Sequence, residues 1–190
     1  MKLRPAPPES NLVERSEILD SVAMARVLRR MAFEIVEKNG PEVYFVGIRT
    51  GGAWLAERMV RLLEEGGEKG PDLGAIDITL YRDDVFLGLP KPEIGPTDLG
   101  KSIDSRTIVL VDDVLNTGRT VRAAMDVLLD YGRPRRVQLA VLVDRGRREL
   151  PIQPDFVGVR QQTTAEHSVR VMFAERGETD RVVLRERIKA

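Results

Sequence analysis

Two adjacent carboxylates and a turn suited to phosphate stand close together in the middle of the chain. Asp112 and Asp113 directly follow an apolar run. Four residues on comes a turn that joins hydroxyls, a glycine and an arginine, namely Thr117, Gly118, Arg119 and Thr120. Adjacent carboxylates can accept charge-assisted hydrogen bonds from ribose hydroxyls, and free amides at a helix start favour phosphate. The spacing predicts a site for a ribose 5-phosphate; the simpler alternative is a strand ending in an acidic turn that caps the next helix.

Other phosphate and metal signatures are missing from the sequence. Neither the P-loop pattern G-x-x-x-x-G-K-[ST] nor the dinucleotide pattern G-x-G-x-x-G occurs. The chain has no cysteine and one histidine, His167. These counts exclude a disulfide framework, a thiol nucleophile and a thiolate metal site. Any metal is therefore expected to be a hard cation with oxygen ligands.

Alternating strands and helices are expected to position these residues. Apolar, β-prone runs occur at 42–48, 75–81, 106–111 and 137–143, and helical patterns at 20–40, 53–65 and 120–131. Such alternation predicts an α/β fold with a parallel sheet covered on both sides. The loops at Arg49, Asp112 and Asp144 each follow a strand. We therefore expect them at one edge of the sheet, where ligands of such sheets bind.

The bulk properties indicate one domain without a membrane segment. The 190 residues carry 30 basic and 30 acidic side chains, so net charge gives no pull toward nucleic acid or membrane. No apolar run approaches the roughly 18 residues that span a bilayer, and no secretory signal is present. We expect a cytoplasmic protein with a tail at 1–17 and a domain at 18–190. Within it we expect a flexible loop at about 83–105 and a hood of short strands at about 144–187.

Several segments resemble known phosphoribosyltransferases. The apolar run, the two acids and the Thr-Gly-x-Thr turn resemble the phosphoribosyl pyrophosphate (PRPP) motif of the type I enzymes. The stretches ITLYRDD, TGRTVRA and QLAVLVDRGRRELP resemble the PyrR family, bacterial pyrimidine operon regulators that double as uracil phosphoribosyltransferases. The resemblance implies a type I phosphoribosyltransferase fold, with a central mostly parallel sheet, flanking helices and a small hood.

The resemblance also implies a reaction and the residues that carry it. Uracil attacks C1 of PRPP, pyrophosphate leaves with Mg²⁺, and UMP forms. Asp112 and Asp113 hold the ribose hydroxyls and assist the metal, mostly through water. The residues implied for PRPP or UMP binding are Arg49, Thr50, Asp83, Asp112, Asp113, Asn116, Thr117, Gly118, Arg119 and Thr120. Arg82 begins the closing loop as a catalytic residue, and Val143, Asp144 and Arg145 lie beside the base.

Two departures from the family pattern leave alternatives open. Gly51 stands where many members have a basic residue after the pyrophosphate-loop threonine, and Asn116 stands where many have tyrosine. Loss of a cation near pyrophosphate could weaken transfer. The second hypothesis is therefore a nucleotide-sensing, RNA-binding regulator with little or no transferase activity. The third hypothesis is a transferase for another base, such as hypoxanthine or orotate. The resemblance of the segment QLAVLVDRGRRELP to PyrR disfavours this hypothesis.

The first predicted helix offers a candidate RNA surface. The resemblance implies binding of pyrimidine-operon (pyr) mRNA, modulated by uridine nucleotides (UMP or UTP), and a homo-oligomer, with no membrane partner. Helical periodicity gathers basic side chains opposite the apolar stripe, with an aromatic among them. The candidate RNA-binding residues are Arg26, Arg29, Arg30, Phe33 and Lys38, with Arg147 in the hood. An aromatic beside cations suits base stacking; the alternative is a solvated charged face with Phe33 in a subunit contact.

Overall fold

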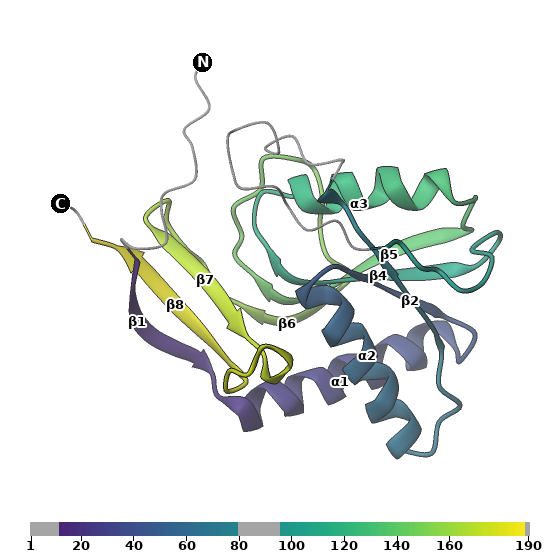
Figure 1. Cartoon of the computed structure of the whole chain (residues 1–190), viewed down its shortest axis with the longest axis horizontal. Coiled ribbons are helices and arrows are strands. Elements are labelled where there is room, and N and C mark those ends of the chain that lie inside the picture. Colours follow the sequence, from purple (N-terminus) through teal and green to yellow (C-terminus); the bar gives the residue numbers. More distant parts are fainter. Residues whose placement is uncertain (1–11, 80–95, 189–190) are drawn as a thin grey trace.

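A five-stranded sheet with helices on both faces forms the body of the protein, and a smaller three-stranded sheet lies beside it (Figure 1). The computed structural model describes residues 12–79 and 96–188. Its elements are β1 (Leu12–Leu19), α1 (Ser21–Asn39), β2 (Tyr44–Ile48), α2 (Gly51–Glu65), β3 (Asp72–Ile76), β4 (Thr107–Leu115), α3 (Arg119–Asp130), β5 (Arg136–Asp144), β6 (Phe156–Arg160), β7 (His167–Met172), the 3-10 helix η3 (Ala174–Arg176) and β8 (Arg181–Arg187).

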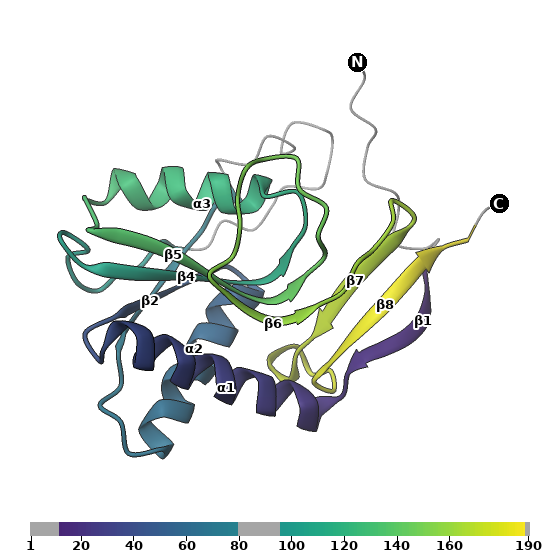
Figure 2. The ribbon, with the colours of Figure 1, turned by 180° about the vertical axis from the view of Figure 1, so that it is seen from behind.

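The large sheet has the strand order β3-β2-β4-β5-β6, and every neighbouring pair is parallel. Helices α1 and α2 cover one face and α3 covers the other (Figures 1 and 2). The small sheet has the order β1-β8-β7 and is antiparallel. These features confirm the predicted fold class, a mostly parallel α/β sheet with a hood.

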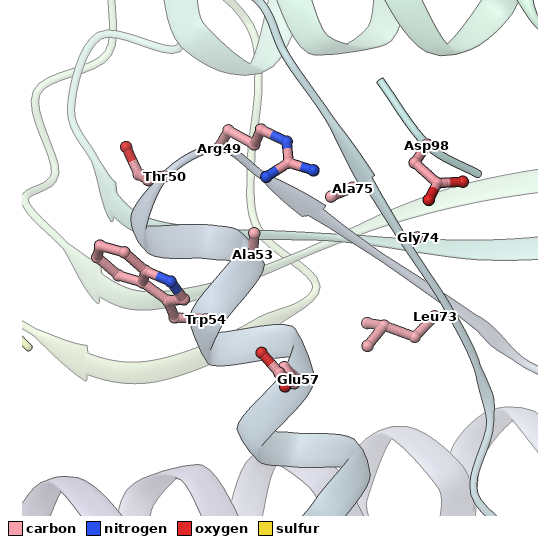
Figure 3. Close-up of a pocket in the computed structure, with 9 residues that line it drawn as sticks. All are labelled: Arg49, Thr50, Ala53, Trp54, Glu57, Leu73, Gly74, Ala75 and Asp98. Carbon is pink, nitrogen blue, oxygen red and sulfur yellow. The ribbon is translucent and has the colours of Figure 1, made fainter. Parts of the chain in front are cut away.

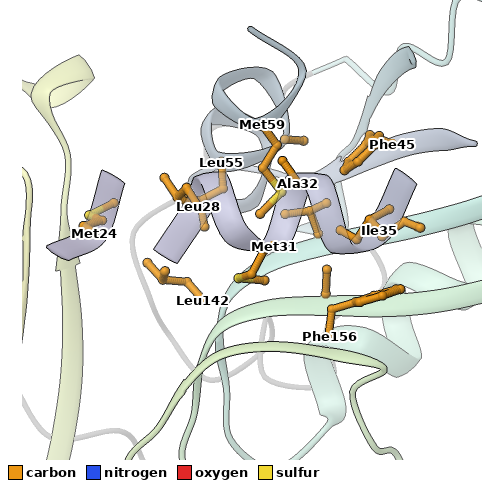
Figure 4. Close-up of a cluster of buried hydrophobic side chains, with 14 of the residues drawn as sticks. Met24, Leu28, Met31, Ala32, Ile35, Phe45, Leu55, Met59, Leu142 and Phe156 are labelled. Carbon is orange, nitrogen blue, oxygen red and sulfur yellow. The ribbon is translucent and has the colours of Figure 1, made fainter. Parts of the chain in front are cut away.

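Helix α1 forms as its sequence predicts. The Asp20 carboxylate accepts a hydrogen bond from the backbone N–H of Ala23 at 2.7 Å, which caps the helix start. The apolar stripe is fully buried against α2 and the sheet (Figure 4), and it comprises Met24, Leu28, Met31 and Ile35. Gly40 then ends the helix with a positive φ of 78°. The stripe thus fixes α1 on the sheet and leaves its arginine-rich side toward solvent.

Close backbone contacts bring the start of α2 onto the strands. A Cβ atom on Gly52 would lie 2.1 Å from the carbonyl oxygen of Val111, and one on Gly47 would lie 2.3 Å from Cα of Ala53. Both neighbours are backbone atoms, which cannot move aside like a side-chain tip. Glycine at these two positions therefore allows the first turn of α2 to rest beside Asp112.

The boundaries of two segments differ from the predicted ones. Residues 12–17, expected in the tail, form most of β1, which pairs with β8 as part of the hood. Residues 156–160, expected in the hood, form β6 and pair in parallel with β5 in the large sheet. The hood sheet is therefore built from both ends of the chain. Strand β1 is mostly exposed and its partner β8 is distant in the sequence, so local periodicity does not reveal the pairing.

The central connection and the sheet strands also differ in detail. The strand expected at 75–81 lies earlier, at β3, while β4 runs on to Leu115 and so contains both aspartates. The expected flexible loop is in part packed, because Leu99 and Ile103 are buried in the core beneath α3 and Ala75 pairs with Asp98. Residues 80–95 of that loop lie outside the described residues. No helix in the described ranges is long and apolar enough to cross a membrane.

Candidate functional site

Three strand ends meet at the carboxyl edge of the sheet. Strands β2 and β4 pair in parallel with Gly47 opposite Val111, and β4 pairs with β5 with Leu115 opposite Asp144. This register places the turn after β2, the end of β4 and the end of β5 side by side. The expectation that these segments share one edge is confirmed.

The two aspartates lie at this edge inside β4. Asp112 is buried and Asp113 half-buried. The backbone N–H of Asp113 donates to Oδ1 of Asp112 at 3.0 Å, and that of Val114 donates to Oδ1 of Asp113 at 2.7 Å. Burial and then the charge of Asp113 raise the pKa of the Asp112 carboxyl well above its usual value, and burial also raises the pKa of Asp113. The pair can therefore accept hydrogen bonds from a ligand, and a bound cation would offset the cost of burying its charge.

The turn after β4, which the sequence predicts to be a phosphate turn, lies at the start of α3. Gly118 adopts a left-handed conformation with φ of 93°, and α3 begins at the next residue. The Thr117 hydroxyl accepts a hydrogen bond from the backbone N–H of Arg119 at 3.4 Å. Oδ1 of Asn116 is buried and has no hydrogen-bond partner in the described part of the chain. Thr120, half-buried, follows in the first turn of α3. Amides and hydroxyls thus converge at a helix start, as predicted from the sequence.

The hood loop that follows β5 is tied to this turn. The backbone N–H groups of Glu149 and Leu150 both donate to the carbonyl oxygen of Thr117, at 3.0 and 3.1 Å. The Arg119 guanidinium pairs with the Glu149 carboxylate at 2.9 Å. Movement of the hood loop is therefore mechanically coupled to the phosphate turn.

Arg148 joins three parts of the site, and no sequence pattern singles it out. Its Nη2 donates to Asp144 Oδ1 at 2.7 Å, its Nε to the Ile152 carbonyl at 2.8 Å and its Nη1 to the Asn116 carbonyl at 3.1 Å. The side chains of Arg148 and Asp144 are only 12% and 9% exposed. Arg148 therefore holds the end of β5, the hood loop and the phosphate turn together.

The residues expected beside the base are placed near the site, but two side chains are already engaged. Val143 is fully buried in the core. Asp144 accepts hydrogen bonds from Arg148 and from the backbone N–H of Gly146. Arg145 is buried and donates to the His167 carbonyl at 2.6 Å. Burial, and then Arg147, lower the pKa of the Arg145 guanidinium. Backbone groups here remain the better candidates for contact with a base.

The turn after β2 contains the expected pyrophosphate residues. The peptide bond between Arg49 and Thr50 is cis. Arg49 extends toward β3, beside a pocket of 280 Å³ that Asp98 and Glu57 also line (Figure 3), and its Nε donates to the Pro96 carbonyl at 3.0 Å. Thr50 is exposed at the start of α2. The side chains of Arg49 and Thr50 therefore point in different directions (Figure 3).

The expected closing-loop residues and the RNA candidates differ in what can be placed. Arg82 and Asp83 lie outside the described residues. On α1, Arg26 and Arg29 are exposed, and Arg147 is exposed in the hood loop. Arg30 Nη2 instead donates to the carbonyls of Val157 and Gly158, both at 2.9 Å. Arg30 therefore ties α1 to β6 as well as facing solvent.

The two remaining RNA candidates on α1 have contacts within the fold. The Phe33 ring packs on the buried core beside Gly66 at the end of α2, and the Arg29 guanidinium lies 5.7 Å from its centre. The Lys38 ammonium lies 4.9 Å from the centre of the Phe156 ring. The Phe33 side chain is therefore in part engaged within its own chain. Arg26 and Arg29 are the cations of this helix best placed to contact a phosphate backbone.

Comparison with known proteins places the chain in a family. Residues 14–173 match the phosphoribosyl transferase domain. The bifunctional protein PyrR of Thermoanaerobacter sp. (strain X514) is 47% identical over 175 residues, covering 91% of this chain and 98% of the relative. That of Streptomyces coelicolor is 48% identical over 173 residues, covering 90% of each. The chain belongs to the PyrR family.

Solved structures support the fold of this PyrR family member. A hypoxanthine-guanine phosphoribosyltransferase from Bacillus anthracis superposes with a TM-score of 0.68 over 92% of this chain and 99% of that one, at 15% identity. The hypoxanthine phosphoribosyltransferase of Trypanosoma cruzi gives a TM-score of 0.68 over 92% and 98%, at 14% identity. At such identities the likeness concerns the fold alone. The PyrR family membership rests on the sequence relatives.

Proposed function

We propose that this protein makes UMP and pyrophosphate from uracil and PRPP, and that it regulates pyrimidine synthesis by binding pyr mRNA according to its uridine nucleotide. The observation that carries the proposal is the pair of a buried Asp112 and a half-buried Asp113, which lies at the end of β4 beside the turn at Gly118 in a PyrR family chain. PRPP and UMP share the ribose 5-phosphate that this arrangement suits. We expect the transferase activity and the regulation to take place in the cytoplasm, where pyr mRNA is found.

The aspartates have a role that their burial explains. As pyrophosphate leaves, C1 of the ribose gains positive charge, which nearby carboxylates stabilise most strongly where water is excluded. Asp112 is buried, and Asp113 lies directly against Gly51 of α2. Both carboxylates can hold the ribose hydroxyls while the backbone bonds from Asp113 and Val114 keep them in place. The phosphate turn then fixes the other end of the sugar.

A magnesium ion fits these residues. Mg²⁺ usually takes one or two carboxylates and keeps waters and substrate phosphates as its other ligands. No cluster of three or more histidine, aspartate or glutamate side chains that could hold a metal lies within residues 12–79 and 96–188. Asp112 and Asp113 are adjacent carboxylates with raised pKa values, which a cation would offset. They would hold the ion, mostly through water, and the ion would neutralise charge on the leaving pyrophosphate.

The remaining assignments follow the family pattern. Arg49 and Thr50 are proposed to contact pyrophosphate, and Arg82 and Asp83 to begin the loop that closes over the substrates. Backbone groups at 143–145 are proposed to read the uracil edge. Closure would exclude water and limit hydrolysis of PRPP.

Turnover with a panel of bases tests the transferase proposal. The purified protein is incubated with Mg²⁺, PRPP and uracil, hypoxanthine or orotate, and UMP or the other nucleotide is measured. We expect turnover with uracil alone. Binding of pyr leader RNA is measured in parallel, with and without UMP. RNA binding without uracil turnover would favour a purely regulatory protein. Turnover with hypoxanthine or orotate would favour a transferase for another base.

Replacement of Arg26 and Arg29 together by alanine is expected to weaken RNA binding and flatten its salt dependence. Removal of one phosphate–arginine interaction with single-stranded RNA should lower the slope of log K against log salt by about 0.7. Filter binding across a salt series measures this slope. A charge-matched control replaces Arg122 and Arg133, which are exposed outside α1. Equal slopes for the two double variants would contradict an RNA surface on α1. Arg30 is a poor choice, because its replacement would also remove the bonds to β6.

A further inference from the structure

Three side chains on one face of α2 contact hood residues that are distant in the sequence. Thr50, Trp54 and Arg58 follow one another at four-residue spacing and so lie on one side of the helix. Arg58 Nη2 contacts Glu175 at 2.5 Å and Asp180 at 2.8 Å. The three side chains of this network are 17–32% exposed. The network fastens the segment after β7 to α2, one turn away from Trp54.

The sole tryptophan of the chain completes this contact. The Trp54 ring lies 5.1 Å from the buried Phe173 ring at an angle of 60°. Packing of this kind is the usual role of an aromatic at helical spacing. The Arg176 guanidinium lies over Trp54, 5.3 Å from the ring centre. Trp54 therefore serves as a platform that supports a cation next to Thr50.

Arg176 differs from the neighbouring hood arginines in its partners. Arg170 pairs with Glu178 at 2.6 Å, and Arg181 pairs with Glu14 at 2.7 Å. Among the residues that the structure describes, no carboxylate lies within salt-bridge distance of Arg176. Its Nη2 donates only a long hydrogen bond, 3.5 Å, to the Thr50 hydroxyl. Arg176 is thus an exposed cation, held in place by stacking and directed at the proposed pyrophosphate turn.

Gly51, the residue after Thr50, lies directly against the Asp113 carboxylate. A Cβ on Gly51 would lie 2.4 Å from Oδ2 of Asp113. Arg176 and Asp113 therefore both lie next to the turn at Thr50 and Gly51, one beside each residue.

We propose that Arg176 supplies the cation that binds the pyrophosphate group of PRPP, in place of a basic residue at position 51. This inference rests on the proposed transferase function. A guanidinium can bind phosphate oxygens with two parallel donors. Arg176 would act together with Arg49, which extends toward β3 (Figure 3) and donates to the Pro96 carbonyl. Since UMP carries no pyrophosphate, Arg176 would distinguish the substrate from the regulatory nucleotide at one ribose phosphate site.

Binding measurements on Arg176→Met test this role without relying on turnover. Methionine keeps an apolar contact with Trp54 and removes the charge. We expect the Kd for PRPP, measured by calorimetry with Mg²⁺ and no base, to rise about 10- to 100-fold. The Kd for UMP should stay unchanged. Arg176→Lys should give an intermediate Kd for PRPP, because it keeps the charge and loses the fork.

Two further measurements separate charge from folding. Arg187→Met, at the other end of β8, is the matched control, and its Kd values should equal those of wild type. Titration with inorganic pyrophosphate should change the emission of Trp54 in wild type, and Arg176→Met should lose this change. PRPP binding as tight in Arg176→Met as in wild type would overturn the inference, as would equal weakening of PRPP and UMP. A wild-type protein that binds neither PRPP nor UMP would instead overturn the proposed function itself.

Discussion

Asp113→Asn is expected to lower kcat/KM for UMP formation by about 100- to 1,000-fold. The asparagine keeps the size and the acceptor oxygen that receives the backbone N–H of Val114. It removes the negative charge that would stabilise the developing charge on C1 and assist Mg²⁺. The loss should therefore fall mainly on kcat, because the ribose hydroxyls can still be bound by Asp112 and the amide.

The same substitution should not unfold the protein. Burial raises the pKa of Asp113, so the folded state prefers the neutral carboxyl. The stability that this preference gives is present below the usual carboxyl pKa and is lost as pH rises through the raised value. A neutral side chain avoids that loss. At neutral pH without Mg²⁺, we expect the melting temperature of Asp113→Asn to match or exceed that of wild type.

Steady-state kinetics with uracil and PRPP, together with thermal unfolding, measure both expectations. Asp126→Asn, an exposed carboxylate on α3, is the control and should leave kcat/KM unchanged. Activity of Asp113→Asn within a few fold of wild type would contradict the role given to this pair. A sharp fall in melting temperature would show instead that the carboxylate has a structural role.

Local signals in the sequence predicted the body of the fold correctly. The cap at Asp20 and the apolar stripe through Met24 and Ile35 correctly predicted α1. Helix ends and periodicity depend on residues that are close in the sequence, so they can be predicted from it. Buried parallel strands made the shared edge of β2, β4 and β5 foreseeable. The assignment of β1 and β6 to their sheets was not foreseeable. Strand β1 is mostly exposed and pairs with β8 at the far end of the chain, which no local pattern encodes.

The site was predictable where its chemistry lies in consecutive residues. Asp112, Asp113 and the turn at Gly118 form one segment, so their spacing alone indicated a ribose phosphate. Arg148 and Arg176 act through contacts 32 and 126 residues away, with Asn116 and Thr50. The sequence does not indicate whether an arginine side chain is buried, stacked on an aromatic ring or exposed to solvent. The arginines at 145–148 therefore indicate only a basic zone in the sequence, although the structure gives each a different environment.

Arg148→Met is expected to lower the free energy of unfolding by about 3 kcal/mol. The substitution leaves the Asp144 carboxylate, only 9% exposed, without its cation. It also removes the donors to the carbonyls of Ile152 and Asn116. Loss of one partner from a buried pair costs more than the pair contributes, because the remaining charge stays buried and unpaired.

The position of these bonds gives the same variant a functional effect. Without Arg148, the hood loop loses its bond to the Asn116 carbonyl and is held to this turn less firmly, so the turn should be less well ordered. We expect UMP to bind more weakly in Arg148→Met. Urea unfolding and UMP calorimetry measure the two effects. Arg147→Met, one residue earlier and exposed, is the matched control and should change neither. Equal stability of the two variants would mean that Asp144 is compensated without Arg148, and weakened UMP binding at full stability would place Arg148 in direct contact with the nucleotide.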